Sequence, residues 1–269
     1  AKKFKQKNKL KIGVITFDPI PKMFFNSNLK NYRISNINQK IDMFNEYKID
    51  FLINKKFDRS FSKIKYHEFI KDIIYKKIKP RYIFVSNNFK FGNKREGDVK
   101  SLKYYENVYN YKIINPSPLK KKSKIISSSL IRKYLASGKL ELANKYLNRN
   151  WTVEGTVQIG RKIGTQIGFP TCNIDIKDYI IAKPGVYAIK SKIGNSNKIF
   201  NGIANLGYRP TFNQKKILLE VNLFNFSKNI YLKKLKVQFI RFIRGERKFK
   251  NIDQLKKQID KDILKTKHK

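Results

Sequence analysis

The segment IGTQIGFPTCNI contains a hydroxyl and a carboxamide two residues apart, at Thr171 and Asn173. Side chains at this spacing share one face of an extended strand, so both polar groups can approach the same ligand. Gly160, Gly164 and Gly168 come shortly before them, and glycine lets the backbone bring its N–H groups close to phosphate oxygens. The segment by itself predicts a ligand-binding turn, although the corner of a barrel also uses glycine.

A second candidate is Glu220, which opens the segment EVNLFNF. Period-two alternation places the side chains of this segment on two faces: Glu220, Asn222, Phe224 and Phe226 on one, and Val221, Leu223 and Asn225 on the other. A carboxylate beside aromatic side chains can serve as the general base for a hydroxyl group. A glutamate at the rim of a barrel, facing water, is the alternative.

Two further segments contain several polar residues within a few positions of one another. NGIANLGYRPTF, at 201–212, has Asn-Gly and Arg-Pro elements that predict a shaped turn. RFIRGERKF, at 241–249, has Arg244 and Glu246 on either side of a glycine, just before a helical pattern. An ordinary loop and an exposed ion pair, respectively, would explain these segments equally well.

The elements that must position these residues form an antiparallel barrel. From Trp151 onward, short strand patterns follow one another closely and are separated by Gly, Pro and Asn. The predicted strands are TVEGTVQI, GVYAIKSKI, IFNGIANL, ILLEVNLFNF and KLKVQFIRFI. One helix then follows, with Asn251 as its cap and an apolar stripe at Ile252, Leu255, Ile259 and Ile263.

The part of the chain before Trp151 has a different pattern. The apolar segments KIGVITF, KIDFLIN, RYIFVS and YKIIN are separated by helix-length segments such as 36–47 and 66–78. Strands that alternate with helices indicate βαβ units and a mostly parallel sheet. We therefore expect an α/β domain over 1–148 and a barrel domain over 149–269.

The charge of the chain raises the question of a nucleic-acid partner. The formal net charge is +42 at pH 7, from 61 Lys and Arg against 19 Asp and Glu. Only 11 of the basic residues are Arg, and the Lys residues are spread along the whole chain beside many Asn and Ile. Nucleic-acid binding proteins concentrate basic residues on one surface and exploit the Arg fork. The distribution favours the compositional drift of an AT-rich genome, so a nucleic-acid partner is not expected.

Other residue types limit the remaining chemistry. Cys172 is the only cysteine, so no disulfide can form within the chain, which fits a cytoplasmic protein. His67 and His268 are far apart in the sequence, which argues against a His-centred catalytic site. No apolar run approaches the length of about 18 residues that a membrane span requires, so no membrane partner is expected.

The segments of the second half, taken together and in order, resemble riboflavin kinase, the flavokinase domain of the bacterial bifunctional riboflavin kinase/FAD synthetase. The segments that carry the resemblance are GFPTCNI, PGVYA, NGIANLGYRPTF, EVNLFNF and RGERKF. The sequence departs from the family at a few positions: Asn222 and Asn225 stand where the family has His and Asp, and Cys172 replaces a usual Ala.

The resemblance implies small-molecule substrates, which are riboflavin or FMN and ATP, and Mg²⁺ as the cofactor. It implies that Thr171 and Asn173 bind Mg²⁺ together with nucleotide phosphate, and that Glu220 is the catalytic base for the riboflavin 5′-hydroxyl. The loop that covers the ATP phosphates would include Gly160, Lys162, Gly164 and Gly168. The residues near the isoalloxazine would be Arg244, Glu246 and Phe249.

The first half resembles the FAD synthetase module, a nucleotidyltransferase of Rossmann-like fold. The segments ITFDPIP, NNFKFGNKREGD and ISSSLIRKYLASG match its motifs in order. The resemblance implies ATP-binding roles for Asn88, Ser128, Ser129 and Arg132. Hydroxyls at a helix start with an Arg one turn later suit phosphate, although Ser is also the ordinary structural choice for a helix cap.

The adenylyl-transfer element of that family, Gly-x-Phe-Asp-Gly-x-His-x-Gly-His, is absent from the printed residues. We expect either an N-terminally incomplete bifunctional enzyme or a lineage that has lost adenylylation. The predicted function is therefore riboflavin kinase, with FAD formation compromised. A basic RNA-binding barrel module and a non-catalytic flavin carrier are the alternatives.

Overall fold

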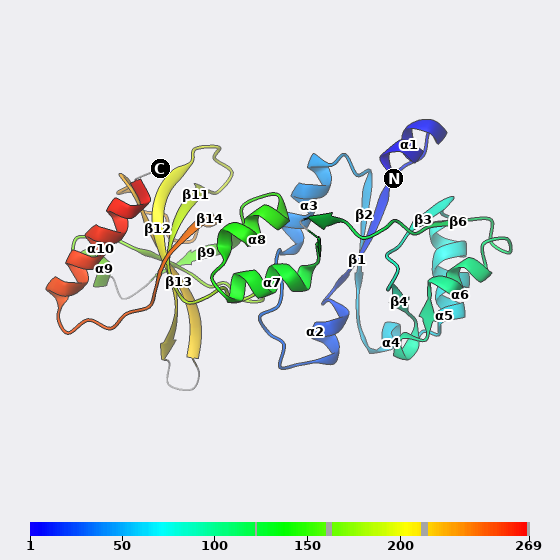
Figure 1. The fold of residues 1–269 in the computed structure, drawn as a ribbon, viewed down its shortest axis with the longest axis horizontal. Helices are drawn as coiled ribbons and strands as arrows, with labels where there is room; N and C mark the ends of the chain where they lie inside the picture. Colours follow the sequence, from blue (N-terminus) through cyan, green and yellow to red (C-terminus); the bar gives the residue numbers. More distant parts are fainter. Residues whose placement is uncertain (122, 160–162, 211–214, 268–269) are drawn as a thin grey trace. The chain divides into compact units, whose positions relative to one another are not determined.

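The computed structural model describes residues 1–121, 123–159, 163–210 and 215–267 (Figure 1). Its internal contacts divide the chain into two compact units. The N-terminal unit comprises Ala1–Leu29 and Asn38–Ile126, and the barrel unit comprises Lys30–Ile37 and Ser127–Lys269. The boundary at 148/149 between functional domains stays a prediction.

Two pairs of parallel strands form the centre of the N-terminal unit, as the alternating pattern predicts. β1 (Gly13–Asp18) pairs with β2 (Phe51–Lys56), and β3 (Tyr82–Phe84) pairs with β6 (Lys112–Ile114). The predicted helical segment 36–47 forms α3 (Ile37–Glu46). The predicted helical segment 66–78 forms α5 (Tyr66–Glu68), which is continued by the π-helix η1 (Phe69–Ile78). The core contains Phe69, Ile70, Ile74, Phe91, Leu102, Tyr111 and Ile113.

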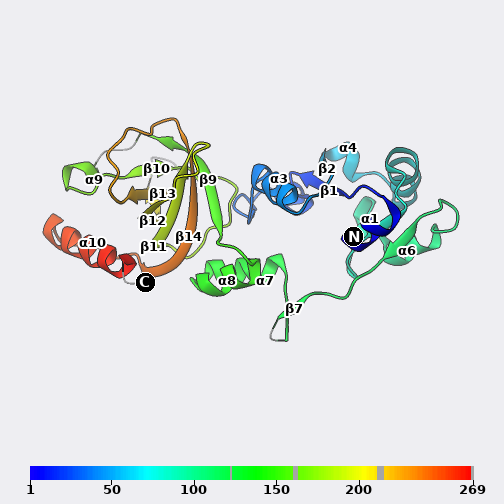
Figure 2. The same ribbon diagram turned by 90° about the horizontal axis from the view of Figure 1, so that it is seen from above.

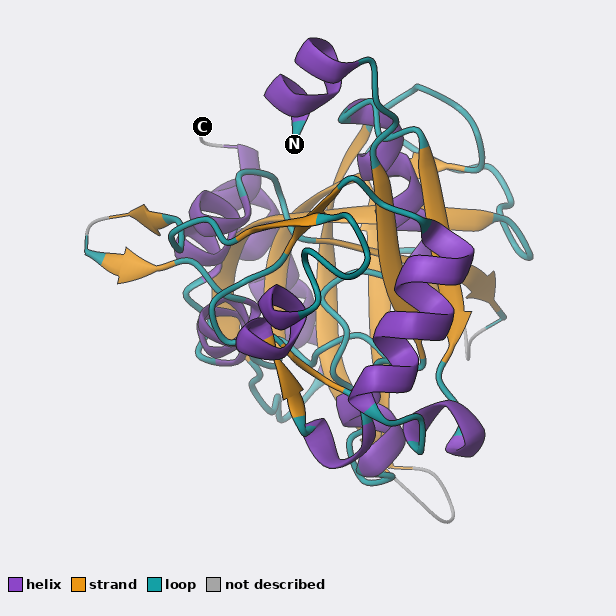
Figure 3. Ribbon diagram, turned by 90° about the vertical axis from the view of Figure 1, so that its right-hand side faces the viewer, coloured by secondary structure: helices purple, strands orange, loops and turns teal. Residues whose placement is uncertain are grey.

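The other elements of this unit are short. The helices are α1 (Lys2–Asn8), α2 (Pro21–Phe25), α4 (Arg59–Ser62), η2 (Asn93–Arg95) and α6 (Val99–Tyr104). The strands are β4 (Lys90–Phe91), β5 (Gly97–Asp98), β7 (Lys120–Lys121) and β8 (Lys124–Ile125). β7 and β8 pair in an antiparallel arrangement, and Figure 3 distinguishes the strands (orange) from the helices (purple).

Six antiparallel strands form a closed barrel in the second unit, in the order β10-β13-β12-β11-β14-β9 (Figure 2). Their bounds are β9 (Thr152–Gln158), β10 (Cys172–Ile174), β11 (Gly185–Ile193), β12 (Phe200–Pro210), β13 (Lys215–Leu223) and β14 (Lys234–Gly245). Each of the five predicted segments contains a strand of the barrel, and β10 adds the strand that closes it. The predicted fold class, an α/β domain followed by a barrel and a helix, is confirmed.

The barrel interior is filled with apolar side chains. Trp151 and Phe239 pack with their ring centroids 4.6 Å apart, and both are fully buried. On β13 the inward residues Leu219, Val221 and Leu223 alternate with Glu220 and other residues of the outer face. Because the interior is packed, a ligand must bind on the outer face of the barrel.

One prediction about β13 is wrong. This strand ends at Leu223, and the chain turns through Asn225, whose φ is 54°. Phe224 and Phe226 therefore do not continue the face that carries Glu220. Phe226 instead packs against Phe200 of β12, with their ring centroids 5.0 Å apart.

Helices α7 (Ser128–Ala136) and α8 (Leu140–Leu147) belong to the barrel unit by their contacts. Asn144 of α8 accepts a hydrogen bond from the Trp151 N–H at 2.8 Å and donates to the Phe239 carbonyl at 2.9 Å. The segment 30–37 also lies in this unit, where the Ile34 carbonyl accepts from the Trp151 indole at 3.1 Å.

Helix α10 (Ile252–Lys267) packs on β12 and β14. The Asn251 side chain accepts a hydrogen bond from the Gln254 N–H at 3.0 Å, so the predicted cap is confirmed. The helices of the described ranges include none that is both long enough and apolar enough to cross a membrane. A short one-turn helix, α9 (Ile163–Gln166), precedes β10.

Candidate active site

A single row of cross-strand neighbours forms the floor of the candidate site. Asn173 lies opposite Glu220, Glu220 opposite Asn205, Asn205 opposite Val186, and Val186 opposite Arg244. Directly opposed residues of a sheet project to the same face, which here is the outer face of the barrel. The row therefore places residues from five strands side by side.

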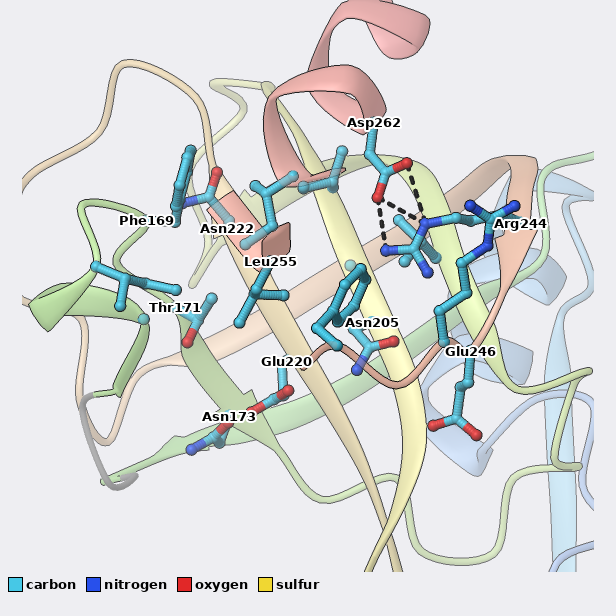
Figure 4. A pocket seen from close by; sticks show the side chains of 18 of the residues that line it. Phe169, Thr171, Asn173, Asn205, Glu220, Asn222, Arg244, Glu246, Leu255 and Asp262 are labelled. Carbon is cyan, nitrogen blue, oxygen red and sulfur yellow. Dashed lines mark hydrogen bonds and ion pairs between the residues drawn. The ribbon is translucent and has the colours of Figure 1, made fainter. Parts of the chain in front are cut away.

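This row lines a cavity of about 350 Å³ that is walled by the segment after α9 on one side and by α10 on the other (Figure 4). Of the sequence-predicted residues, the cavity brings together Gly164, Thr171, Asn173, Glu220, Arg244, Glu246 and Phe249. Gly168 is not among the lining residues. Gly160 and Lys162 lie outside the described residues.

Oxygen-bearing side chains gather at one end of the cavity. Thr171, Asn173 and Glu220 lie near one another there. Asn173 is 7 % exposed, and its Oδ1 has no hydrogen-bond partner among the described residues. Buried acceptors are almost always satisfied, so an orphaned oxygen beside a hydroxyl and a carboxylate fits a bound cation.

The donor set at this end suits Mg²⁺ that shares its ligands with phosphate. Within the described residues there is no group of three or more His, Cys, Asp or Glu that could hold a metal ion. A cation here would take neutral oxygens from Thr171 and Asn173 and the rest of its ligands from phosphate and water.

The turn that carries Thr171 is held by two hydrogen bonds. The Phe169 N–H donates to the Gly164 carbonyl at 2.8 Å, and the Asn222 carboxamide donates to the Pro170 carbonyl at 2.7 Å. A Cβ at position 164 would overlap the Phe169 carbonyl, so the turn requires glycine there. These contacts fix the backbone on the N-terminal side of Thr171.

Cys172 lies between Thr171 and Asn173 in the sequence but is not among the residues that line the cavity. The side chain is half-buried, and burial raises the pKa of the Cys172 thiol to about 11. The thiol therefore stays protonated at neutral pH, which makes it a poor nucleophile.

A buried ion pair lies at the other end of the cavity. The Arg244 Nη2 is 2.7 Å from the Asp262 carboxylate, and the Arg244 Nε donates to the same carboxylate at 2.8 Å. The two side chains are 11 % and 1 % exposed. Gln258 also donates to Asp262 at 2.8 Å. This pair joins β14 to α10, so α10 becomes a fixed wall of the cavity.

The sequence left open an exposed ion pair between Arg244 and Glu246, which flank Gly245. The structure does not show this pair, because Arg244 pairs with Asp262 on α10. The Glu246 carboxylate lies directly against Gly207, so a Cβ added at position 207 would collide with it. The guanidinium carbon of Arg244 lies 5.8 Å from the ring centroid of Phe249. The end of the cavity thus combines an aromatic ring, a buried cation and an exposed carboxylate.

The predicted residues of the first half and of α7 lie elsewhere. Asn88 belongs to the N-terminal unit, where its side chain accepts a hydrogen bond from the Ser86 hydroxyl at 2.9 Å. Ser128 and Ser129 are the first residues of α7, and Ser127 is the cap, accepting from the Leu130 N–H at 3.2 Å.

Arg132 is held by the segment 30–37. Its Nε donates to the Tyr32 carbonyl at 2.8 Å, and its guanidinium carbon lies 3.6 Å from the Tyr32 ring centroid. Desolvation lowers the pKa of Arg132. These contacts give the side chain a structural role beside the one expected from the sequence.

Asp262 and Asn205 are two polar residues of the site that the sequence did not single out. Asp262 follows Leu255 and Ile259 at helical spacing, so it lies on the apolar face of α10. A carboxylate on an apolar helix face signals a buried partner. Asn205 lies within the segment NGIANLGYRPTF, but only the strand register reveals that it faces Glu220.

Comparisons with known proteins find family matches for both parts of the chain. The family model described as riboflavin kinase matches residues 147–269, and the model described as FAD synthetase matches residues 1–130. The bifunctional riboflavin kinase/FMN adenylyltransferase of Buchnera aphidicola subsp. Schizaphis graminum is 40% identical, over 97% of this chain and 84% of the relative. The protein of the same name from Haemophilus influenzae is 36% identical, over 94% and 82% of the two chains.

A solved structure covers the whole chain as well. A crystal structure described as a macrolide-efflux protein from Streptococcus pneumoniae matches with a TM-score of 0.86 and 26% identity, over 100% of this chain and 87% of that one. The efflux description belongs to that protein, whereas the sequence relatives and both family models agree on flavin enzymes. The chain therefore belongs to the family of bifunctional riboflavin kinases/FMN adenylyltransferases.

Proposed function

We propose that the barrel unit transfers the γ-phosphoryl group of ATP to the 5′-hydroxyl of riboflavin and so forms FMN. The observation that carries this proposal is the position of Glu220, which has Asn173 on one neighbouring strand and Asn205 on the other, within a single cavity. The match of residues 147–269 to riboflavin kinase supports the same activity.

The proposed role of Glu220 is to orient the riboflavin 5′-hydroxyl and accept its proton as the hydroxyl oxygen attacks the γ-phosphorus of ATP. The bond from this phosphorus to the β-phosphate oxygen then breaks, and ADP leaves. Phosphoryl transfer depends mainly on the positioning of the two reactants and on charge stabilisation. A carboxylate that hydrogen-bonds the hydroxyl would meet the first requirement, and a cation held beside it by Thr171 and Asn173 would meet the second.

Mg²⁺, when bound, would neutralise charge on the transferred phosphoryl group. Thr171 and Asn173 are the residues that would hold it, through the hydroxyl and the orphaned Oδ1. The loop with Gly160, Lys162, Gly164 and Gly168 is proposed to lie over the phosphates of ATP, as exposed backbone N–H groups suit phosphate oxygens.

The flavin ring is proposed to bind at the end of the cavity formed by Arg244, Glu246 and Phe249. Leu255 and Ile259 of α10 supply an apolar wall there. A flat aromatic ligand suits a site that combines an aromatic ring and apolar side chains with a few polar groups.

The second activity of the family is the adenylylation of FMN, and residues 1–130 match the FAD synthetase model. We propose ATP-binding roles for Asn88 in the N-terminal unit and for Ser128, Ser129 and Arg132 in α7. A cytoplasmic location stays a prediction. The comparisons give no support to an RNA-binding module or to a non-catalytic flavin carrier.

The deciding experiment incubates the purified chain with riboflavin, ATP and Mg²⁺ and separates FMN from FAD by chromatography. FMN formation is expected. The appearance of FAD after FMN would add the second activity. Riboflavin binding without ADP release would favour a carrier instead, and tight, salt-sensitive RNA binding that ignores riboflavin would favour an RNA-binding module.

Removal of either proposed Mg²⁺ ligand should raise the metal requirement. In Thr171→Ala and Asn173→Ala, we expect the Mg²⁺ concentration for half-maximal FMN formation to increase roughly tenfold or more, since about 1.4 kcal/mol of lost binding is a factor of ten. Cys172→Ala is the matched control, because it changes the residue between them. Unchanged Mg²⁺ dependence in both ligand variants would contradict the assignment.

A further inference from the structure

The turn that carries Thr171 lies where the pairing between β10 and β13 stops. Cys172, the first residue of β10, faces Val221 of β13, and the pairing does not extend to Thr171 before it. One step further along this register, Thr171 would face Asn222. Beyond the N-terminal end of β10, the Asn222 side chain takes the place of the backbone pairing. Its carboxamide donates a hydrogen bond to the Pro170 carbonyl at 2.7 Å.

Asn222 is well placed to hold this turn rigidly. It is 9 % exposed and lies on the same outer face as Glu220, two residues along β13. It also lines the cavity. A hydrogen bond to a buried carboxamide is costly to remove, because the partner carbonyl is then left unsatisfied.

The consequence concerns the direction of two other side chains. Pro170 immediately precedes Thr171, so a hydrogen bond on the Pro170 carbonyl fixes the peptide that enters Thr171. Asn173, two residues on, is fixed by the backbone pairing of β10 with β13. The hydroxyl and the orphaned Oδ1 can meet one cation only if both ends of this short segment stay in register.

We propose that Asn222 is a positioning residue of the phosphate and cation end of the site, which acts by holding Pro170 and thereby Thr171. This inference rests on the proposed riboflavin kinase function and deepens it. Asn222 acts through the turn and takes no part in the chemical step. Its loss should therefore weaken the use of Mg-ATP more than the binding of riboflavin.

The test compares three variants by steady-state kinetics and by riboflavin fluorescence. Asn222→Leu keeps the size of the side chain and removes the donor. Asn222→Asp keeps size and polarity but cannot donate when ionised, so it replaces the Leu variant if that protein does not fold. Asn222→His restores a donor, because its Nδ1 is as far from Cβ along the side chain as the Asn amide nitrogen.

In Asn222→Leu and Asn222→Asp, the KM for Mg-ATP is expected to rise about tenfold, while the dissociation constant of riboflavin stays within about twofold. Asn222→His should return the KM to within about threefold of the unmodified value. Ser191→Ala is the control, since Ser191 is buried in the barrel but does not line the cavity, and no change is expected.

An unchanged KM for Mg-ATP in the Leu and Asp variants would overturn the positioning role. Equal weakening of riboflavin and Mg-ATP binding would also overturn it, because that result indicates a general distortion of the barrel. Failure of the unmodified chain to form FMN would instead overturn the proposed function.

Discussion

Glu220→Gln should lower the rate of FMN formation by about a hundredfold or more while riboflavin still binds. The amide has the shape of the carboxylate but cannot accept the proton of the 5′-hydroxyl, and general-base catalysis contributes roughly 10² to 10⁴ in rate. The two neighbours of Glu220, Asn173 and Asn205, would remain in place. The measurement is single-turnover FMN formation together with riboflavin fluorescence titration.

Glu154→Gln is the matched control for this experiment. Glu154 also lies on a barrel strand, but it pairs with Lys236 at 3.0 Å and does not line the cavity. Its replacement should leave the rate nearly unchanged. Turnover of Glu220→Gln close to that of Glu154→Gln would rule out Glu220 as the base.

Asp262→Asn should destabilise the barrel unit and weaken riboflavin binding together. Asp262 is the partner of the buried Arg244 guanidinium, and removal of one member of a buried ion pair typically costs about 3–5 kcal/mol because the other charge is left unpaired. α10 would also lose its ion pair with β14, while Arg241 of β14 would still donate to the Lys265 carbonyl of α10. Denaturant unfolding and riboflavin titration measure the two effects.

Two further variants separate charge from packing. Asp260→Asn changes an exposed carboxylate on the same helix and should alter the free energy of unfolding by no more than about 0.5 kcal/mol. The double variant Arg244→Met/Asp262→Leu removes both charges, so it should recover much of the stability but not the riboflavin affinity. Normal stability of Asp262→Asn would show that the pair does not hold α10.

Much of the barrel and of its site could be predicted because both follow local patterns. Alternating apolar and polar residues identify the strands. The spacing of Thr171 and Asn173 predicts that their side chains lie on one side, and both line the cavity although Thr171 precedes the first residue of β10. The cap at Asn251 is also a local signal. These features need only the geometry of a few neighbouring residues.

The remaining features depend on the end of an element or on distant contacts. Phe224 and Phe226 continue the alternation in the sequence, but β13 ends at Leu223. The chain turns there, with Asn225 in the left-handed conformation. The partner of Arg244 is on a helix 18 residues further along the chain, whereas Glu246 is the nearer carboxylate in sequence. Sequence spacing does not reveal which of these two carboxylates the folded chain brings to the Arg244 guanidinium.

The alternation along β13 has a consequence for how this protein can change over evolutionary time. Leu219, Val221 and Leu223 hold the barrel together, while Glu220 and Asn222 between them line the cavity. Selection for stability and selection for substrate therefore act on different residues of one strand. A new ligand preference can arise by replacement of outward side chains, with the packed interior left as it is.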